Sequence, residues 1–234
     1  VNGHVEFMKK EVKRPSPDKT KLSDSMKQTR ASRSQWMKDT QPSTAEVIEK
    51  YPTLSIVEML HEEFTAKTGI DLVPKLLAFI NHCGARCLEL AKGRRCAKET
   101  VSEIEAHLEK LEGDTKKYCF AVGVLRKLPM LLKEQLRFLK GPDTYPALSL
   151  EISKLHEAKE IVATFEALNV DVIDIIDGIA AIIEIYWIFD VKYSSHNKNT
   201  FAVLEHFSGL QTSTRTALVL RTISCIEEGF DKTA

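Results

Sequence analysis

Apolar residues recur every three or four positions along most of the chain, a spacing typical of helices with one buried face. The clearest stripe consists of Leu72, Leu76, Ile80, Cys83, Cys87 and Leu90. Similar spacing predicts helices near residues 44–50, 55–67, 100–111, 115–139, 177–190, 200–207 and 216–228. We therefore predict an all-α fold, arranged as an irregular multi-helix bundle.

Capping sequences mark several of the predicted helix ends. Ser43 and Glu46 have the Ser-x-x-Glu spacing in which a hydroxyl and a carboxylate satisfy free amides at a helix start, and so do Ser55 and Glu58. Gly69 follows the second of these helices and suits a helix C-terminus. Both Ser-x-x-Glu pairs are thus predicted to begin helices.

Residues 147–176 fit two interpretations. The segment 150–168 can form a helix, and we favour that interpretation. The segment from Ile161 to Ile176 also alternates like a strand and contains many β-branched residues. The strand alternative therefore stays open for this part of the chain.

The N-terminal residues 1–42 have a different composition. They are rich in Lys, Ser, Thr and Pro, and residues 1–39 contain ten Lys and Arg against five acidic residues. Few large apolar residues are present to offset the entropy lost on ordering. We predict a flexible, disordered basic arm over 1–42, followed by one helical domain over 43–230 with a possible sub-boundary near 141–146.

The most apolar stretch lies between residues 171 and 209. Acidic residues interrupt every window long enough to span a bilayer, so no membrane association is predicted and the segment must be buried against protein. Its surplus of apolar helical surface indicates a protein contact, which includes self-association through 177–207. The candidate interaction residues are Tyr186, Trp187, Phe189, Phe201 and Phe207.

Four segments carry a family resemblance. They read WMKDTQPSTAEVIEKYPTL, a helix containing EEF, KLPMLLKEQLRFL, and FDVKYSSHNKNTFAVLEHF. Over residues 35–210 the chain resembles the region outside the SAM domain in a family expanded in fish, the sterile-alpha-motif-domain-containing protein 3-like proteins. A SAM domain itself is not evident in the sequence. The resemblance implies no catalytic residue.

Two groups of residues could in principle support catalysis or metal binding. Asp174, Asp177 and Glu184 share one side of a helical wheel, but no neighbouring His, Lys or phosphate loop supports acid–base or Mg²⁺ chemistry. Potential zinc ligands occur at His82, Cys83, Cys87 and Cys96, although the two central thiols fall on an apolar helix face. We predict no catalytic residue, no cofactor and no metal.

A basic patch follows the 72–90 helix. Its members are Arg86, Lys92, Arg94, Arg95 and Lys98. Together with residues 9–38 it offers an alternative function, a nucleic-acid-associated factor of chromatin or mobile-element origin. The acidic residues that follow between 99 and 114 would repel a polyanion, so nucleic acid is possible but not favoured.

Charge and cysteine content complete the prediction. The 33 basic and 33 acidic residues cancel, and the odd count of five cysteines is typical of reduced thiols rather than a disulfide framework. No signal peptide is evident, so an intracellular location, cytoplasmic or nuclear, is expected. The favoured function is a non-catalytic protein-interaction or scaffolding module, not an enzyme.

Overall fold

The computed structural model describes residues 1–94, 98–139, 144–150, 158, 160–210 and 215–228. Backbone contacts divide the chain into two compact units, each drawn from three separate segments. Unit 1 comprises residues 1–71, 141–150 and 159–192, and unit 2 comprises residues 72–140, 151–158 and 193–234. Residues 43–230, expected to form one helical domain, are therefore shared between both units.

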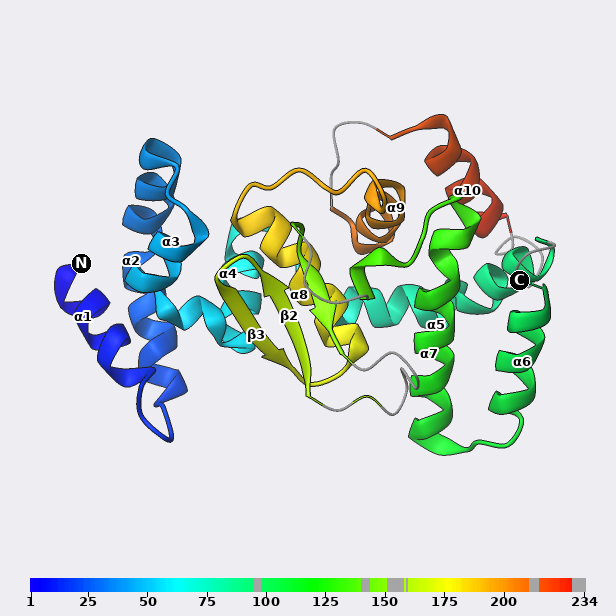
Figure 1. Cartoon of the computed structure of the whole chain (residues 1–234), viewed down its shortest axis with the longest axis horizontal. Coiled ribbons are helices and arrows are strands. Elements are labelled where there is room, and N and C mark those ends of the chain that lie inside the picture. Colours follow the sequence, from blue (N-terminus) through cyan, green and yellow to red (C-terminus); the bar gives the residue numbers. More distant parts are fainter. Residues whose placement is uncertain (95–97, 140–143, 151–157, 159, 211–214, 229–234) are drawn as a thin grey trace. The chain divides into compact units, whose positions relative to one another are not determined.

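Unit 1 combines helices with a small sheet (Figure 1). Its helices are α1 (Asn2–Glu11), α2 (Lys19–Thr40), α3 (Thr44–Lys50), the 3-10 helix η1 (Pro52–Ser55), α4 (Val57–Thr68) and α8 (Ile175–Ile188). Its strands are β1 (Ala147–Ser149), β2 (Ile161–Phe165) and β3 (Leu168–Val172). The predominantly helical class predicted from the sequence is confirmed, with this sheet added to it.

The sheet is antiparallel with the order β1-β2-β3. Ala163 pairs with both Leu148 and Val170, and α8 covers one face of the strands (Figure 1). The favoured helix over 150–168 is therefore wrong where β2 is described, while residues 151–157 and 159 lie outside the described residues. The turn sequence explains why the hairpin was not predicted. Glu166 adopts a positive φ of 49° in the two-residue turn joining β2 to β3, and glycine or asparagine at such a position would have signalled a hairpin.

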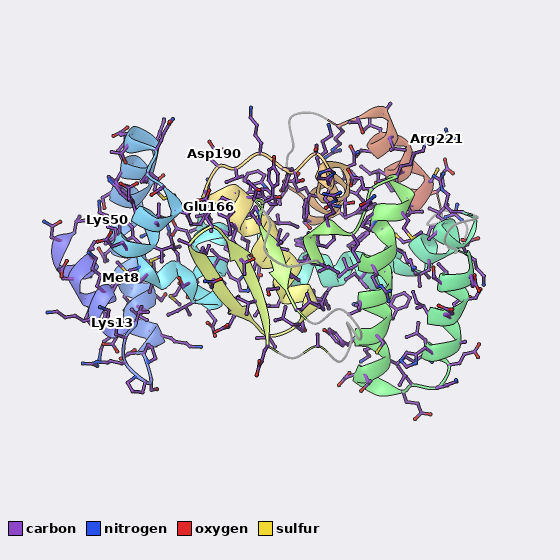
Figure 2. The ribbon with its side chains drawn as sticks, in the orientation of Figure 1. Met8, Lys13, Lys50, Glu166, Asp190 and Arg221 are labelled. Atoms are coloured by element: carbon purple, nitrogen blue, oxygen red, sulfur yellow. The ribbon has the colours of Figure 1, made fainter. Side chains whose placement is uncertain are left out.

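The flexible arm predicted over 1–42 is also wrong, because α1 and α2 occupy most of it. Met8 is fully buried and Thr53 Oγ1 donates a hydrogen bond to its sulfur at 3.1 Å (Figure 2). Leu22 and Met26, one helical turn apart, enter the same core. Apolar residues are sparse here, yet their partners come from residues 47–59, so two short apolar stripes suffice to order both helices.

One of the two predicted capping boxes forms. At the start of α3, Ser43 Oγ accepts a hydrogen bond from the Glu46 amide, and the Glu46 carboxylate accepts one from the Ser43 amide at 2.8 Å. The second box is wrong, because Ser55 ends η1 and Ile56 becomes the N-cap of α4. Gly69 ends α4 in the left-handed conformation, as predicted.

In its described residues, unit 2 contains helices and connecting turns but no strand. Its elements are α5 (Leu72–Lys92), α6 (Lys98–Leu108), α7 (Gly113–Leu131), the 3-10 helix η2 (Arg137–Leu139), α9 (Lys198–Ser208) and α10 (Ala217–Glu227). The central helix α5 contacts α6, α7, α9 and α10. At Gly84, side chains of α7 pack directly on the backbone of α5, because an added Cβ would lie 2.8 Å from the Phe120 ring and 2.9 Å from a Val124 methyl group.

Candidate functional site

Two of the three predicted acids converge on a histidine in unit 1. Asp177 and Glu184 lie seven residues apart on one face of α8, and both point to His61 of α4. The His61 Nε2 atom is 2.8 Å from Asp177 Oδ1, and Nδ1 is 2.7 Å from Glu184 Oε2. We call these three residues the His61 triad. Their side chains are 23%, 10% and 1% exposed, respectively, so the triad is largely buried.

The triad holds opposite charges together. Burial alone would lower the pKa of His61, but hydrogen bonds to both carboxylates and their charges raise it to about 10. Burial likewise opposes ionisation of Asp177, yet His61 and the Ile173 amide hold its pKa below the usual value. For the deeply buried Glu184, burial outweighs His61 and raises the pKa. A protonated imidazolium therefore bridges the two acidic positions at neutral pH.

The third acid has a separate role. Asp174 is the N-cap of α8, and its carboxylate accepts hydrogen bonds from the amides of Ile176 at 2.8 Å and Asp177 at 2.9 Å. Both ring nitrogens of His61 contact carboxylates of α8, so the arrangement ties α4 to α8.

Sequence reasoning missed His61 because it lies 116 and 123 residues from its partners. A local motif search cannot detect such a contact. The available signal was the pair of acids on the most apolar helix of the chain, since buried carboxylates need a cationic or hydrogen-bonding partner.

The candidate interaction residues of α8 pack within unit 1. Tyr186 is 2% exposed. Trp187 is half-buried edge-on against Phe64, with ring centroids 6.2 Å apart, and its carbonyl accepts a hydrogen bond from Lys67. Phe189 is also half-buried and contacts the ring of Phe165 at 6.0 Å.

The two candidates of α9 pack within unit 2. Phe201 is fully buried and contacts the rings of Phe138 at 5.3 Å and Tyr193 at 5.0 Å. Phe207 is half-buried and stacks on Phe79 of α5, with ring centroids 4.6 Å apart. The predicted 177–207 region is thus divided between two cores.

An open groove of about 740 Å³ lies in unit 2 among α5, α9 and α10. Its lining includes Phe79, Cys83, Phe207, Ser224, Glu227 and Glu228. Leu220 lies one helical turn before Ser224 on the same face of α10 and is 50% exposed. The stacked phenylalanines supply an apolar floor, and the end of α10 supplies an acidic rim.

Cysteines of the predicted zinc group lie beside this groove without forming a described metal site. Burial raises the pKa of Cys83 to about 11, with a further contribution from Glu227, and burial raises that of Cys87 to about 12. Both thiols are therefore protonated at neutral pH in the metal-free chain, and the described residues contain no group of three or more potential ligands that could hold a metal ion. His82 is exposed and its Nδ1 is 2.7 Å from the Ala78 carbonyl oxygen. Cys96 lies outside the described residues.

Three members of the basic patch have contacts within unit 2. Arg86 pairs with Glu89 at 2.7 Å and donates a hydrogen bond to the Cys225 carbonyl, and Lys92 pairs with Glu105 at 2.5 Å. Arg94 donates a hydrogen bond to the carbonyl of Leu131. Arg95 and the side chain of Lys98 lie outside the described residues.

Many basic residues of the N-terminal region are also paired. Of the ten Lys and Arg in residues 1–39, six lie within 4.0 Å of a carboxylate. These are Lys9, Arg14, Lys19, Lys21, Arg30 and Arg33. Arg33 is fully buried, where it pairs with Glu63 and lies over the Tyr51 ring. At least one of these N-terminal basic residues, Arg33, therefore contributes to the packing of unit 1.

Comparison with known families gives one partial match. Residues 4–56 match the profile of the family described as sterile alpha motif domain-containing protein 3, helical domain. The match supports the resemblance noted in the sequence, over a different and shorter range than 35–210. No curated protein and no solved structure matches the chain. Within the described ranges, every helix is too short or too polar to cross a bilayer.

Proposed function

We propose that this chain is a protein-binding module without a catalytic step of its own, and that the groove of unit 2 receives an apolar side chain of a partner protein. The groove carries this proposal. Its volume of about 740 Å³ lies within the range of ~300–1,000 Å³ found for binding pockets. The stacked Phe79 and Phe207 rings give its floor a rigid, largely apolar surface.

The surroundings of the groove support docking of a protein segment. Leu220 extends the apolar surface beyond the floor, since it is half exposed on the same face of α10. Glu227 and Glu228 form a polar edge beside it. An apolar centre with a polar rim is the usual anatomy of a protein interface.

The His61 triad supports a non-catalytic role. It contains the residue types of an acid–base site, but each ring nitrogen of His61 already contacts a carboxylate. The charges of the triad therefore have a structural role, which is to hold α4 and α8 together. The family-profile match over residues 4–56 agrees with a helical module but names no partner.

Self-association through 177–207 remains a narrower form of this proposal. Tyr186 and Phe201 are buried, so a second copy would have to contact the half-buried Trp187, Phe189 or Phe207. Light scattering across a range of protein concentrations tests this form. The nucleic-acid alternative has less support, because six of the ten N-terminal basic residues have acidic partners within the chain.

Selection from a displayed library of random twelve-residue peptides tests the proposed function. The bait is the full chain, and the comparison bait carries Ser224→Trp, which fills the groove from an exposed position of α10. Thr115→Trp, at an exposed position of α7, controls for the added indole. We expect peptides that bind the unmodified chain and the Thr115 variant and lose at least tenfold in affinity for the Ser224 variant. Peptides that bind all three baits equally, or no enriched peptide, would refute the proposal.

A further inference from the structure

We propose that the groove of unit 2 selects basic segments, in which Lys or Arg residues flank one large apolar side chain. This inference rests on the proposed function and adds the chemistry of the partner.

The carboxylates of Glu227 and Glu228 line the groove, and no described Lys or Arg lines it. His82 is its other ionisable side chain beside the Cys83 thiol. The Glu227 side chain is 51% exposed and its Oε1 lies 3.0 Å from His206 Nε2, so one of its carboxylate oxygens is engaged. Glu228 is exposed at the end of the described part of α10. Carboxylates at the C-terminal end of a helix add to the negative end of its dipole and favour a cationic partner.

Arg86 of α5 does not cancel this rim. It lies on the same helix face as His82 and Phe79, and its guanidinium pairs with Glu89 and donates a hydrogen bond to the Cys225 carbonyl. The Arg86 charge also interacts with Glu228, but one guanidinium beside the three carboxylates of Glu89, Glu227 and Glu228 leaves an excess of negative charge. A segment with acidic flanks would therefore be repelled, and one with basic flanks attracted.

The apolar residues at the base of the groove determine which kind of side chain can bind there. Phe79 and Phe207 present stacked ring surface, and Cys83 beside them is a protonated thiol that behaves as a small apolar group. A Phe, Trp, Leu or Met side chain buries apolar area on such a surface, whereas a charged side chain would lose hydration without a partner. One apolar anchor with basic neighbours therefore fits both the floor and the rim.

The composition of the selected peptides provides the first test. We expect the peptides that lose affinity for the Ser224→Trp bait to be enriched in Lys and Arg within three positions of a central apolar residue. If groove-dependent peptides are enriched in Asp or Glu, or show no charge preference, the basic-segment proposal is overturned while the proposed function stands. If no peptide depends on the groove, the proposed function itself fails.

Charge variants provide the second test, with a selected peptide as the probe. In Glu227→Gln/Glu228→Gln, neutral side chains of the same shape retain the packing of α10. Glu103→Gln/Glu109→Gln removes the same charge from exposed positions elsewhere in unit 2. We expect about fivefold to tenfold weaker binding for the groove variant at 50 mM salt and less than twofold for the control, with the difference shrinking at 500 mM salt. Equal binding by both variants at low salt would contradict the proposal.

Light scattering of the same samples distinguishes a partner peptide from a second copy of this chain as the occupant of the groove. If the groove instead receives a second copy of this chain, Ser224→Trp will convert a dimer to a monomer without any added peptide. That outcome would overturn the basic-segment proposal. A monomer with and without the substitution, combined with groove-dependent binding of basic peptides, supports it.

Discussion

The two units of this chain stabilise their cores with different kinds of contact. Unit 1 buries opposite charges side by side, in the Arg33–Glu63 pair and in the His61 triad. Unit 2 relies on stacked aromatic rings, and the buried charges Lys127 and Glu205 contact hydroxyl groups of Thr100 and Tyr193. A buried charge is tolerated only while its partner is present, whereas a ring contact depends mainly on volume. The buried ion pairs of unit 1 therefore make that unit sensitive to pH and to the loss of a charged partner.

The chain contains its own reporters for this comparison. Both tryptophans, Trp36 and Trp187, belong to unit 1, so tryptophan fluorescence follows that unit. Cys83, Cys87 and Cys119 are buried in unit 2, so the rate at which their thiols react with a disulfide reagent follows the other unit. Effects on the two units can thus be measured in one sample.

The largest effect is expected for His61→Ala. This change leaves the acidic side chains of Asp177 and Glu184 buried without their cation, which costs about 3–5 kcal/mol of unfolding free energy. Urea denaturation followed by tryptophan fluorescence measures it. Lys19→Ala is the control within the same unit, because Lys19 and its partner Glu58 are both about half exposed and such pairs contribute only ~0–1 kcal/mol. A cost below 1 kcal/mol for His61→Ala would show that the triad does not stabilise unit 1.

The next expected effect is a pH dependence that His61 confers. In the unfolded chain a histidine loses its proton near pH 6.5, whereas the pKa of His61 in the folded chain is about 10. Its stabilising contribution is complete below pH 6.5 and is lost as the pH rises towards 10. The unfolding free energy of unit 1 should therefore fall by up to ~1.4 kcal/mol per pH unit in this window.

His61→Gln isolates this contribution, because the cysteine thiols that also titrate at alkaline pH are present in both proteins. Denaturation at pH 6.5, 7.5 and 8.5 gives a steeper decline for the unmodified chain than for His61→Gln. Asp177 affects stability at acidic pH. Because its pKa is lowered in the folded chain, its contribution to the unfolding free energy is lost as the pH falls below ~4. Parallel declines for the two proteins would mean that His61 is not held protonated.

A smaller effect, equal in both units, is expected at two helix glycines. At Gly178 an added Cβ would lie 2.8 Å from the buried Leu148 side chain, and at Gly84 it would lie 2.8 Å from Phe120. Gly178→Ala and Gly84→Ala should each cost about 1–3 kcal/mol, because crowding outweighs the gain in helix propensity. Gly3→Ala in α1 meets no atom within 4 Å and should be neutral or stabilising. Unequal costs for Gly178 and Gly84 would show that the units differ in packing tolerance as well as in charge.

The sequence predicted features that depend on neighbouring residues, and it did not predict features that depend on contacts between distant residues. Local signals were read correctly where periodicity or capping determines the element, as in α5 and at Ser43. Contacts between distant residues were not, as in the approach of His61 to α8 and the burial of Met8 beneath η1. The hairpin at Glu166 was missed because its turn lacks the usual residues. Pairing over more than a hundred residues leaves no local pattern to detect.

The smallest effect on the unfolding free energy is expected at the two serines of the predicted capping boxes. Ser43 and Ser55 each precede a glutamate by three residues, but only Ser43 forms the capping box; Glu58 instead pairs with Lys19 at 2.5 Å. Ser43→Ala should cost about 1 kcal/mol, because it removes the acceptor for the Glu46 amide. Ser55→Ala should change the unfolding free energy by less than ~0.5 kcal/mol. Both serines lie in unit 1, so tryptophan fluorescence measures both under identical conditions. Equal losses would mean that α4 begins with a cap at Ser55 in solution, as the sequence pattern alone predicts.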